Sequence, residues 1–374
     1  MTCLLMCLLL LQPHDLNFGK TGPNLGTVHD TSFGMSPDGE ILVRGVGPQS
    51  PYVWVFARDG FLRKRIDLKR DLPSQYDHSW MVAKVLKQKL RGEDDSDHYF
   101  VSCLRLGDGN GGLNRRIFAF DKHFQFAGVC QLGDMKKTID QREKRPEVTG
   151  AKNELYIHNY YQHDDMLFVQ NLWHDPKTKN WHSRWDKVEI TRADDGFRYR
   201  MVDEPILLRV YPDTKIDSYL NLEWLSFSKQ ADQVFTIKEF EPVIERYSFR
   251  EKNLKNEIGD INLVLDNYYP YWAYNMNKDQ FDEYSKEARS KLSTIVGMYP
   301  LESGNFLISY VSHFDSDREL LLQIVDPFGE KVGPPESYFN GYLAGVKNGE
   351  AYIVAGETNA RGKTSWSLEV QAFP

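Results

Sequence analysis

Short apolar runs separated by polar turns cover most of the chain. Six times, a turn rich in Asp, Asn, Gly or Ser precedes a strand-like run, at residues 41–43, 99–101, 155–157, 234–235, 306–308 and 352–354. The runs are β-branched and aromatic, which suits a pleated, half-buried strand. The turn residues tolerate the positive φ angles of tight hairpins. The pattern predicts a repeated unit of antiparallel strands.

A second hairpin follows in several of these units, and its outer strand carries more charge. Its turns lie at residues 58–60, 121–123, 238–241 and 326–329. A charged outer strand is typical of a strand that faces solvent. Four strands per unit and six units predict an all-β fold, a six-bladed β-propeller with four-stranded antiparallel blades. Residues 15–374 would then form a single domain.

The spacing between turns is longer than compact blades need, so insertions are expected at residues 69–96, 174–219 and 251–290. Within the last, Phe281, Tyr284, Ala288 and Leu292 follow a helical spacing and predict a short amphipathic helix over residues 278–292. Residues 78–91 are interpreted as a second short helix. Residues 15–29 are expected to add a strand to the last unit, at residues 338–374, and so close the ring.

Charge and composition narrow the class of protein. The 374 residues carry 46 Lys+Arg against 53 Asp+Glu, and 13% are aromatic. A mixed, mildly acidic chain lacks the basic footprint of a nucleic-acid-binding protein, and its aromatic content is that of a folded chain. The sequence contains no Gly-x-Ser-x-Gly, His-Glu-x-x-His or Cys-x-x-Cys motif. The well-marked nucleophilic and zinc chemistries therefore have no support.

The N-terminal segment suggests export. Residues 3–11 are an unbroken apolar run, too short to span a bilayer but of the length of a signal-peptide core. No Lys or Arg precedes Lys20, and Cys7 follows a weak lipoprotein-like Leu4-Leu5-Met6. Residues 1–14 are interpreted as a signal or lipoprotein segment, with a lipid anchor through Cys7 as one outcome. The expected location is periplasmic, outer-membrane-associated or secreted. The alternative is a buried N-terminal strand, and no other run is long enough for a transmembrane span.

Cys103 and Cys130 lie in the apolar runs 98–106 and 124–132, with a third run, 116–122, between them. If these are consecutive antiparallel strands, the two outer strands are not neighbours, and the Cα atoms of the cysteines are too far apart for a disulfide. The sequence predicts two buried free thiols.

The turn Ser36-Pro37-Asp38-Gly39-Glu40 and the hairpin Val-Phe-x-x-Asp-Gly-Phe-Leu at residues 55–62 resemble the six-bladed propeller superfamily. The similar groups are the NHL-type and TolB-like propellers and the exported bacterial six-bladed propeller proteins. The resemblance extends over nearly the whole chain. Members include protein- and RNA-interaction modules, glycan-associated exported proteins, and calcium-dependent lactonases and esterases. The resemblance therefore implies the fold and leaves the activity open.

In propellers of this type, ligands usually meet the loops and innermost strands around the central channel. Polar residues expected where those strands begin are His29, Asp30, His78, Trp80, Glu147 and Glu223. Asp30, Glu147 and Glu223 would offer the hard oxygen ligands that Ca²⁺ prefers. His29 and His78 could add an acid or base near neutral pH. The alternative is that these side chains only cap strands and turns.

A second candidate site is an aromatic cluster in the third insertion. Tyr268, Tyr269, Tyr271, Trp272 and Tyr274 lie within seven residues, interrupted by Pro270. Aromatic faces with hydroxyl groups suit stacking on sugars or contact with a protein partner. The alternative is an insertion that packs its own rings against the propeller.

Two hypotheses about function follow. The preferred one is an exported, non-catalytic propeller scaffold that binds a protein or glycan partner. The alternative is a channel-mouth, metal-dependent hydrolase of lactonase or esterase type, for which Ca²⁺ would be the cofactor. No other cofactor is indicated.

Overall fold

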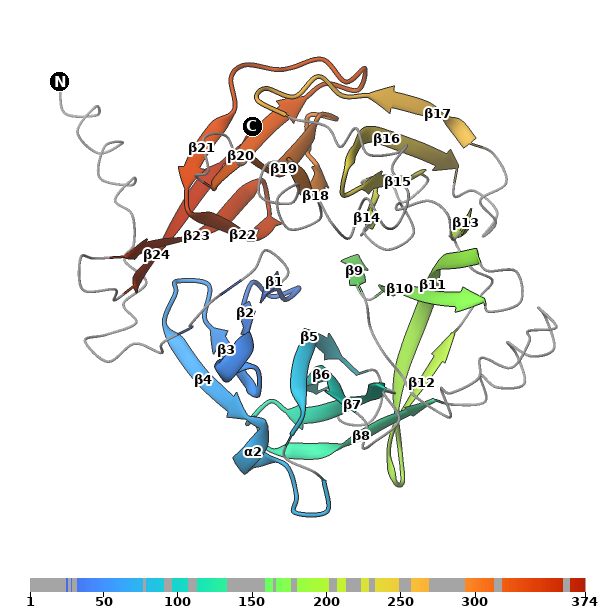
Figure 1. The fold of residues 1–374 in the computed structure, drawn as a ribbon, viewed down its shortest axis with the longest axis vertical. Helices are drawn as coiled ribbons and strands as arrows, with labels where there is room; N and C mark the ends of the chain where they lie inside the picture. The colour runs from blue at the N-terminus through green and yellow to red at the C-terminus, as the bar shows by residue number, and fades with distance from the viewer. Residues whose placement is uncertain are drawn as a thin grey trace.

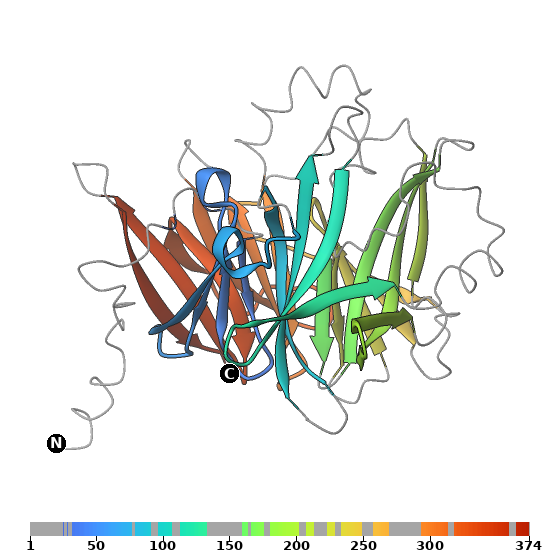
Figure 2. The same ribbon diagram turned by 90° about the horizontal axis from the view of Figure 1, so that it is seen from below.

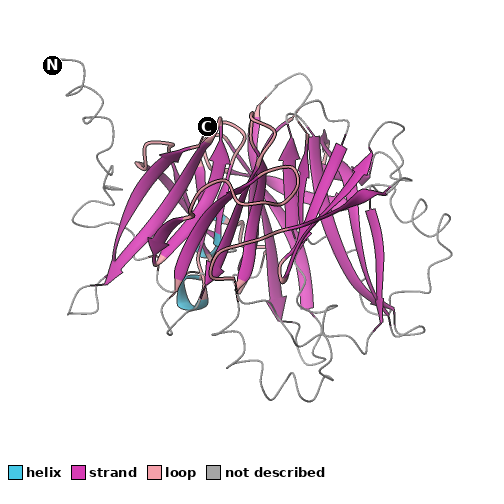
Figure 3. Cartoon of the chain, turned by 90° about the horizontal axis from the view of Figure 1, so that it is seen from above, coloured by secondary structure: helices cyan, strands magenta, loops and turns pink. Residues whose placement is uncertain are grey.

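The computed structural model consists of antiparallel β-meanders arranged around a central axis (Figure 1). The described residues are mainly strands, with a short α-helix, α2 (Leu68–Asp71), after the first meander and a 3-10 helix at Gly47–Gln49 (Figure 3). The structure describes residues 25, 28, 32–76, 79–90, 96–106, 113–132, 159–163, 166–175, 180–201, 207–212, 223–228, 233–248, 257–268, 293–312, 318–358 and 364–373.

Hydrogen bonding divides the described strands into five sheets. The first sheet contains β1 (Phe33–Met35), β2 (Ile41–Arg44), β3 (Tyr52–Phe56) and β4 (Leu62–Asp67). Two later sheets also follow chain order, namely β14 (Glu223–Phe227), β15 (Gln233–Lys238), β16 (Glu241–Ser248) and β17 (Glu257–Asn262), then β18 (Thr294–Pro300), β19 (Phe306–Ser312), β20 (Glu319–Val325) and β21 (Glu336–Phe339). The last sheet has three strands, β22 (Gly341–Lys347), β23 (Glu350–Thr358) and β24 (Thr364–Ala372).

The remaining sheet is nine-stranded and departs from the prediction of purely antiparallel four-stranded units. It contains β5 (Met81–Lys89), β6 (Asp97–Leu106), β7 (Leu113–Asp121), β8 (Phe126–Leu132), β9 (Asn159–His163), β10 (Met166–Asp175), β11 (Asn180–Ala193), β12 (Gly196–Met201) and β13 (Leu207–Pro212). The outer strands β8 and β12 pair in parallel, with Phe197 opposite Cys130, and thereby join two meanders. A Cβ on Gly196 would lie 2.7 Å from Val129 O, so glycine permits this close approach.

One hairpin turn recurs along the chain. At Ser36, Ala57, Asp121, Leu301 and Asp326 the backbone N–H bonds to the carbonyl four residues later, while the N–H three residues later bonds back. The fourth residue of these turns has positive φ, and it is glycine in all of them except Phe124, at φ 62°. Phe124 stacks on Tyr99 with ring centroids 4.8 Å apart, which helps to hold this unfavourable backbone.

Apolar cores fill the spaces between neighbouring meanders. One lies between the β1–β4 and β5–β8 meanders, and further cores follow between each meander and the next. Another core joins β22–β24 back to β1–β3, through residues such as Val354, Leu368 and Trp54. Leu25 and Val28 are buried in that same core. The meanders therefore hold one another in a ring, as Figure 1 shows.

One expectation from the sequence is wrong. Residues 78–91 were predicted to form a helix, but residues 81–89 are strand β5. A bulge between Val82 and Lys84 adds one residue to the strand, so Val82 and Val85 face the same core at a helix-like spacing of three. In the third meander, the innermost strand that the structure describes is β9, which begins at Asn159. Glu147, near which a strand was expected to begin, lies outside the described residues. The predicted helix at residues 278–292 and the closing strand near residues 15–29 fall outside the described residues, apart from Leu25 and Val28.

The innermost strands β1, β5, β9, β14, β18 and β22 run in the same direction along the axis (Figure 2). Hydrogen bonds fix this alignment: Tyr160 Oη donates to Val85 O and Gln162 Nε2 to Lys87 O, so β9 rises alongside β5. We call the end where these strands finish the turn end, and the end where they start the entry end. Any site near the axis must open toward one of these two ends.

Candidate functional site

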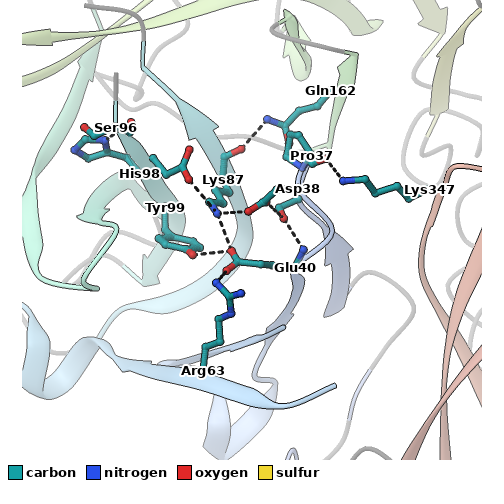
Figure 4. Close-up of polar contacts among 12 residues, drawn as sticks. Pro37, Asp38, Glu40, Arg63, Lys87, Ser96, His98, Tyr99, Gln162 and Lys347 are labelled. Carbon is teal, nitrogen blue, oxygen red and sulfur yellow. Dashed lines mark hydrogen bonds and ion pairs between the residues drawn. The ribbon is translucent and has the colours of Figure 1, made fainter. Parts of the chain in front are cut away.

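The turn end carries an ionic network centred on Lys87 of β5 (Figure 4). Its Nζ lies 2.5 Å from Asp38 Oδ2, 3.1 Å from Glu40 Oε2 and 3.2 Å from Asp97 Oδ2. The side chains of Lys87 and Glu40 are 7% and 3% exposed. Glu40 also accepts hydrogen bonds from Tyr99 Oη, at 2.6 Å, and Arg63 Nη1, at 2.7 Å. Charges from the first two meanders are thus neutralised by one another.

This network holds the ring together. Burial opposes the charge on Lys87, but the hydrogen bonds from its ammonium group to Asp38 and Glu40 outweigh it and raise the pKa of Lys87. For Asp38, burial also opposes ionisation, and the bonds from Lys87 and Ser36 outweigh it and lower the pKa. Each charged group of the network is paired with a neighbour of opposite charge, so the network is suited to stabilising the contact between the first two meanders.

A second polar junction at the turn end ties the last meander to the first. Arg58 donates hydrogen bonds to Tyr352 Oη and to the carboxylate of Glu350, and Lys347 Nζ donates to Pro37 O. The Arg58 guanidinium also lies over the Tyr352 ring, 5.3 Å from its centroid. These contacts reinforce the apolar core between β22–β24 and β1–β3.

The entry end presents arginines held against aromatic rings. The guanidinium carbons of Arg105 and Arg116 lie 5.4 and 5.8 Å from the ring centroid of Trp80, which precedes β5. Arg116, which is exposed, also lies 5.6 Å from the centroid of Tyr76. At the start of β22, Arg318 lies 3.9 Å from the centroid of Tyr342. Arg318 also donates from Nη1 to Gly341 O. A cation–π contact orients a guanidinium through its face and does not use its N–H groups.

Carboxylates near the entry end have partners of their own. Glu223, at the start of β14, is 1% exposed and accepts a hydrogen bond from Trp185 Nε1 at 2.9 Å. Glu241 Oε2 lies 2.5 Å from Lys238 Nζ. Within the part of the chain that the structure describes, no carboxylate contacts Arg116. The arrangement can therefore bind an anionic group.

Between the two ends, β5 carries Lys84, which is half-buried on the innermost strand. Burial, and secondly the positive charge of Arg44, lower the pKa of Lys84 to about 8. Arg44, the last residue of β2, donates from Nη1 to the carbonyl oxygen of Val82 on β5, 3.4 Å away. One residue further along, Tyr160 Oη donates to Val85 O at 2.8 Å. A Cβ on Gly34 would lie only 3.2 Å from that hydroxyl, so β1, β5 and β9 converge on Tyr160.

Two of the predicted channel-mouth residues are described, and both serve packing. Trp80 is buried in the core between the first two meanders. Glu223 begins an innermost strand as expected, but its carboxylate is held by Trp185 and its backbone carbonyl accepts from Asn159 Nδ2 at 2.9 Å. The others, His29, Asp30, His78 and Glu147, lie outside the described residues, so the predicted Ca²⁺ ligand set Asp30, Glu147 and Glu223 stays a prediction. The described residues hold no cluster of three potential metal ligands.

Of the aromatic cluster, only Tyr268 is described. It packs against the core between β14–β17 and β18–β21, with its ring 5.7 Å from that of Tyr310. Packing, the alternative weighed from the sequence, accounts for this ring. Tyr269, Tyr271, Trp272 and Tyr274 lie outside the described residues, and their role stays a prediction.

The cysteine prediction is confirmed. Cys103 on β6 and Cys130 on β8 are buried and free, with β7 between their strands. Burial raises the pKa of the Cys130 thiol to about 12 and that of Cys103 well above its usual value. Neither thiol is suited to nucleophilic chemistry.

Sequence reasoning missed the cationic residues of the entry end and of the inner wall, namely Arg44, Lys84, Arg105, Arg116 and Arg318. These residues lie within or beside strands, and a charged residue at such a position is usually interpreted as facing solvent. One signal was available: Arg44 and Lys84 each follow directly on a short apolar run, Ile41-Leu42-Val43 and Met81-Val82-Ala83. None of the helices in the described ranges is long and apolar enough to cross a membrane.

The chain matches no protein-family model and no curated protein. Among solved structures, it is similar to a DUF4221 family member from Bacteroides vulgatus, with 10% identity, a TM-score of 0.51, and coverage of 92% of this chain and 93% of that one. A Bacteroides fragilis protein thought to be exported has 10% identity, a TM-score of 0.43 and coverage of 94% and 93%. The periplasmic gluconolactonase of Pseudomonas aeruginosa has 10% identity, a TM-score of 0.35 and coverage of 94% and 88%. At such identity, the DUF4221 likeness shows the fold alone, and that fold is propeller-like.

Proposed function

We propose that the protein is an exported six-bladed β-propeller that binds an acidic glycan at its entry end, without catalysis. The six-bladed count is supported by the six innermost strands that run in one direction and by the apolar cores that link each meander to the next. In this interpretation, the parallel pairing of β8 with β12 joins the outer strands of two blades into the nine-stranded sheet.

One observation carries the choice of ligand. Arg116 is exposed, is oriented by Trp80 and Tyr76, and has no carboxylate partner among the described residues. A guanidinium held in this way can donate two parallel N–H bonds to a carboxylate or sulfate. A sugar polymer that carries such groups satisfies this donor pair, and its ring faces can pack on neighbouring aromatic side chains.

A binding assay with oligogalacturonate tests the proposal, with a neutral cello-oligosaccharide as the ligand control. We expect Arg116→Gln to weaken oligogalacturonate binding by roughly tenfold, the usual effect of losing one charged hydrogen-bonding group. Arg65→Gln is the matched control, because Arg65 also lies over a ring, 4.8 Å from the Tyr52 centroid, but on the outer strand β4. Equal binding by both variants, or preference for the neutral sugar, would reject the acidic-glycan proposal. Selective binding of acidic proteins instead would favour a protein partner.

Export is part of the proposal and rests on the apolar run at residues 3–11. Expression of the full chain followed by cell fractionation tests it, and a cytoplasmic product that keeps residues 1–14 would contradict it. The metal-dependent hydrolase alternative predicts stoichiometric Ca²⁺ in protein purified without chelator. Elemental analysis of the same preparation distinguishes the two functions.

A further inference from the structure

We infer that Tyr76 determines the specificity of the entry end, because its hydroxyl group binds a hydroxyl group of the ligand next to the acidic group on Arg116. The inference rests on the proposed function and deepens it, since it restricts the ligand to sugar acids among all polyanions. Two observations carry it. The ring of Tyr76 is fixed beside Arg116, and its hydroxyl group is accessible to solvent.

The segment that carries Tyr76 is anchored on both sides. Before it, Leu68 and Leu72 are buried in the core between the first two meanders. After it, Trp80 is buried in the same core. The backbone N–H of Tyr76 donates to Pro73 O at 2.9 Å, which closes a turn just before the ring. The position of Tyr76 is therefore set by packing and hydrogen bonding of its own segment.

Aromatic contacts fix the ring itself. The Tyr76 ring meets that of Phe118 edge-on, with centroids 5.4 Å apart, and lies 5.6 Å from the ring of Phe126. The guanidinium carbon of Arg116 lies 5.6 Å from the Tyr76 centroid and 5.8 Å from the Trp80 centroid. Trp80 in turn meets Phe118 edge-on at 5.4 Å. One aromatic cluster thus holds Tyr76 and Arg116 beside each other.

The protein itself does not use the polar groups of this pair. Arg116 is exposed, and its guanidinium makes no hydrogen bond or ion pair within the part of the chain that the structure describes. Tyr76 is half-buried, but its hydroxyl oxygen is not, and this oxygen has no hydrogen-bond partner among the described residues. Two neighbouring side chains therefore present several N–H donors and a hydroxyl group to solvent.

These groups complement an acid that also carries hydroxyl groups. The guanidinium can donate two parallel N–H bonds to a carboxylate or a sulfate. The tyrosine hydroxyl can donate and accept, which suits a ligand hydroxyl that does the same. In a sugar acid, the acidic group and a hydroxyl group are carried on neighbouring carbons, whereas a glutamate or aspartate side chain has no such hydroxyl. The pair therefore favours a sugar acid over an acidic peptide.

Two acidic oligomers of matched length test the inference: oligogalacturonate, which carries hydroxyl groups, and oligoacrylate, which carries carboxylates alone. We expect the full chain to prefer oligogalacturonate, and Tyr76→Phe to weaken that binding by about fivefold, the usual effect of losing one neutral hydrogen bond. The affinity for oligoacrylate should stay the same in Tyr76→Phe, because that oligomer offers Tyr76 no hydroxyl group. The variant keeps the ring, so its contacts with Phe118 and Phe126 remain.

Tyr52→Phe is the matched control. The Tyr52 ring also lies beside an arginine, 4.8 Å from the guanidinium carbon of Arg65, and its hydroxyl oxygen is likewise neither buried nor hydrogen-bonded within the described ranges. We expect this variant to bind both oligomers as the unaltered chain does. Unchanged oligogalacturonate binding in Tyr76→Phe would overturn the inference. An equal loss for both oligomers would also overturn it, because a merely structural role of Tyr76 would have that effect.

Arg116→Gln separates the inference from the proposed function, since it should weaken the binding of both oligomers. Weaker oligogalacturonate binding in Arg116→Gln, with no change in Tyr76→Phe, would overturn the role of Tyr76 and leave the proposed function intact. Absence of oligogalacturonate binding by the unaltered chain would reject both. A loss in Tyr76→Phe that is limited to oligogalacturonate would support both.

Discussion

At the scale of single residues, the ionisation of a side chain is decided by what the fold places around it. Lys84 and Lys87 share a strand and a residue type, but the pKa of the first is lowered and that of the second is raised. The sequence around them, Lys84-Val85-Leu86-Lys87, does not reveal the difference. The carboxylates around Lys87 come from β6 and from the turn between β1 and β2, so only the assembled fold can distinguish the two lysines.

Lys84 should destabilise the folded protein at neutral pH. Its folded-state pKa of about 8 is below the ordinary value of 10.5, so the unfolded chain binds the proton more tightly. The cost is present in full below about pH 8 and disappears as the pH rises past the unfolded pKa. We therefore expect Lys84→Met to raise the free energy of unfolding by about 1 kcal/mol near pH 7, with the gain fading toward pH ~10. Urea unfolding at the two pH values checks this, and a gain that grows with pH would contradict it.

Lys87 should behave in the opposite way. Lys87→Met leaves the buried carboxylate of Glu40 without its ammonium partner, and we expect a loss of about 3–5 kcal/mol in the free energy of unfolding. Lys89→Met, at the exposed end of the same strand, is the control and should change stability by less than about 0.5 kcal/mol. Chemical denaturation of both variants measures the difference. Similar small effects in the two would show that the Lys87 network does not hold the meanders together.

At the scale of elements, the local signals in the sequence predicted the strands and hairpins well. The turn at Ser36 and the strands β2, β15 and β19 lie where the pattern placed them, because Asp, Asn and Gly specify tight turns over a few residues. The strand β5 was missed because its bulge imitates helical spacing. The junction of β8 with β12 could not be predicted from the sequence. It depends on the close approach of Gly128 and Gly196, which are distant in the chain and meet only in the fold.

The junction between β8 and β12 gives a test at this scale. Gly196 has φ +134°, and a Cβ there would lie 2.7 Å from Val129 O. We expect Gly196→Ala to cost about 2–4 kcal/mol, from backbone strain and from separation of the two strands. Gly259→Ala is the matched control, because Gly259 has φ +126° but nothing within 4 Å of its Cβ position, so it reports backbone strain alone. Equal losses in the free energy of unfolding would mean that the close approach contributes nothing.

At the scale of the whole molecule, stability depends on closing the ring. The core between β22–β24 and β1–β3 brings together residues from both ends of the chain, including Leu25, Val28 and Leu368. Sequence reasoning expected such closure and located it in the last unit. It could not identify the polar contacts of Arg58 and Lys347, which form only when the first and last meanders meet.

Leu368→Ala tests the importance of closure. Leu368 is 1% exposed, and we expect its truncation to cost about 2–5 kcal/mol. Hydrogen exchange should show the loss in β1–β3 as well as in β22–β24, because the core is shared. Phe328→Ala, on a ring that is 82% exposed, is the control and should have little effect on either region. Faster exchange in β22–β24 alone would mean that the ring does not unfold as a unit.

The account as a whole makes one central claim, that the entry end of the ring receives an acidic ligand. The most direct measurement is a crystal structure of the full chain grown with saturating oligogalacturonate. We predict sugar at the entry end, with one carboxylate on the Arg116 guanidinium beside Trp80. Sugar bound at the turn end, against Asp38 and Lys87, or an entry end without sugar at saturation, would contradict the claim.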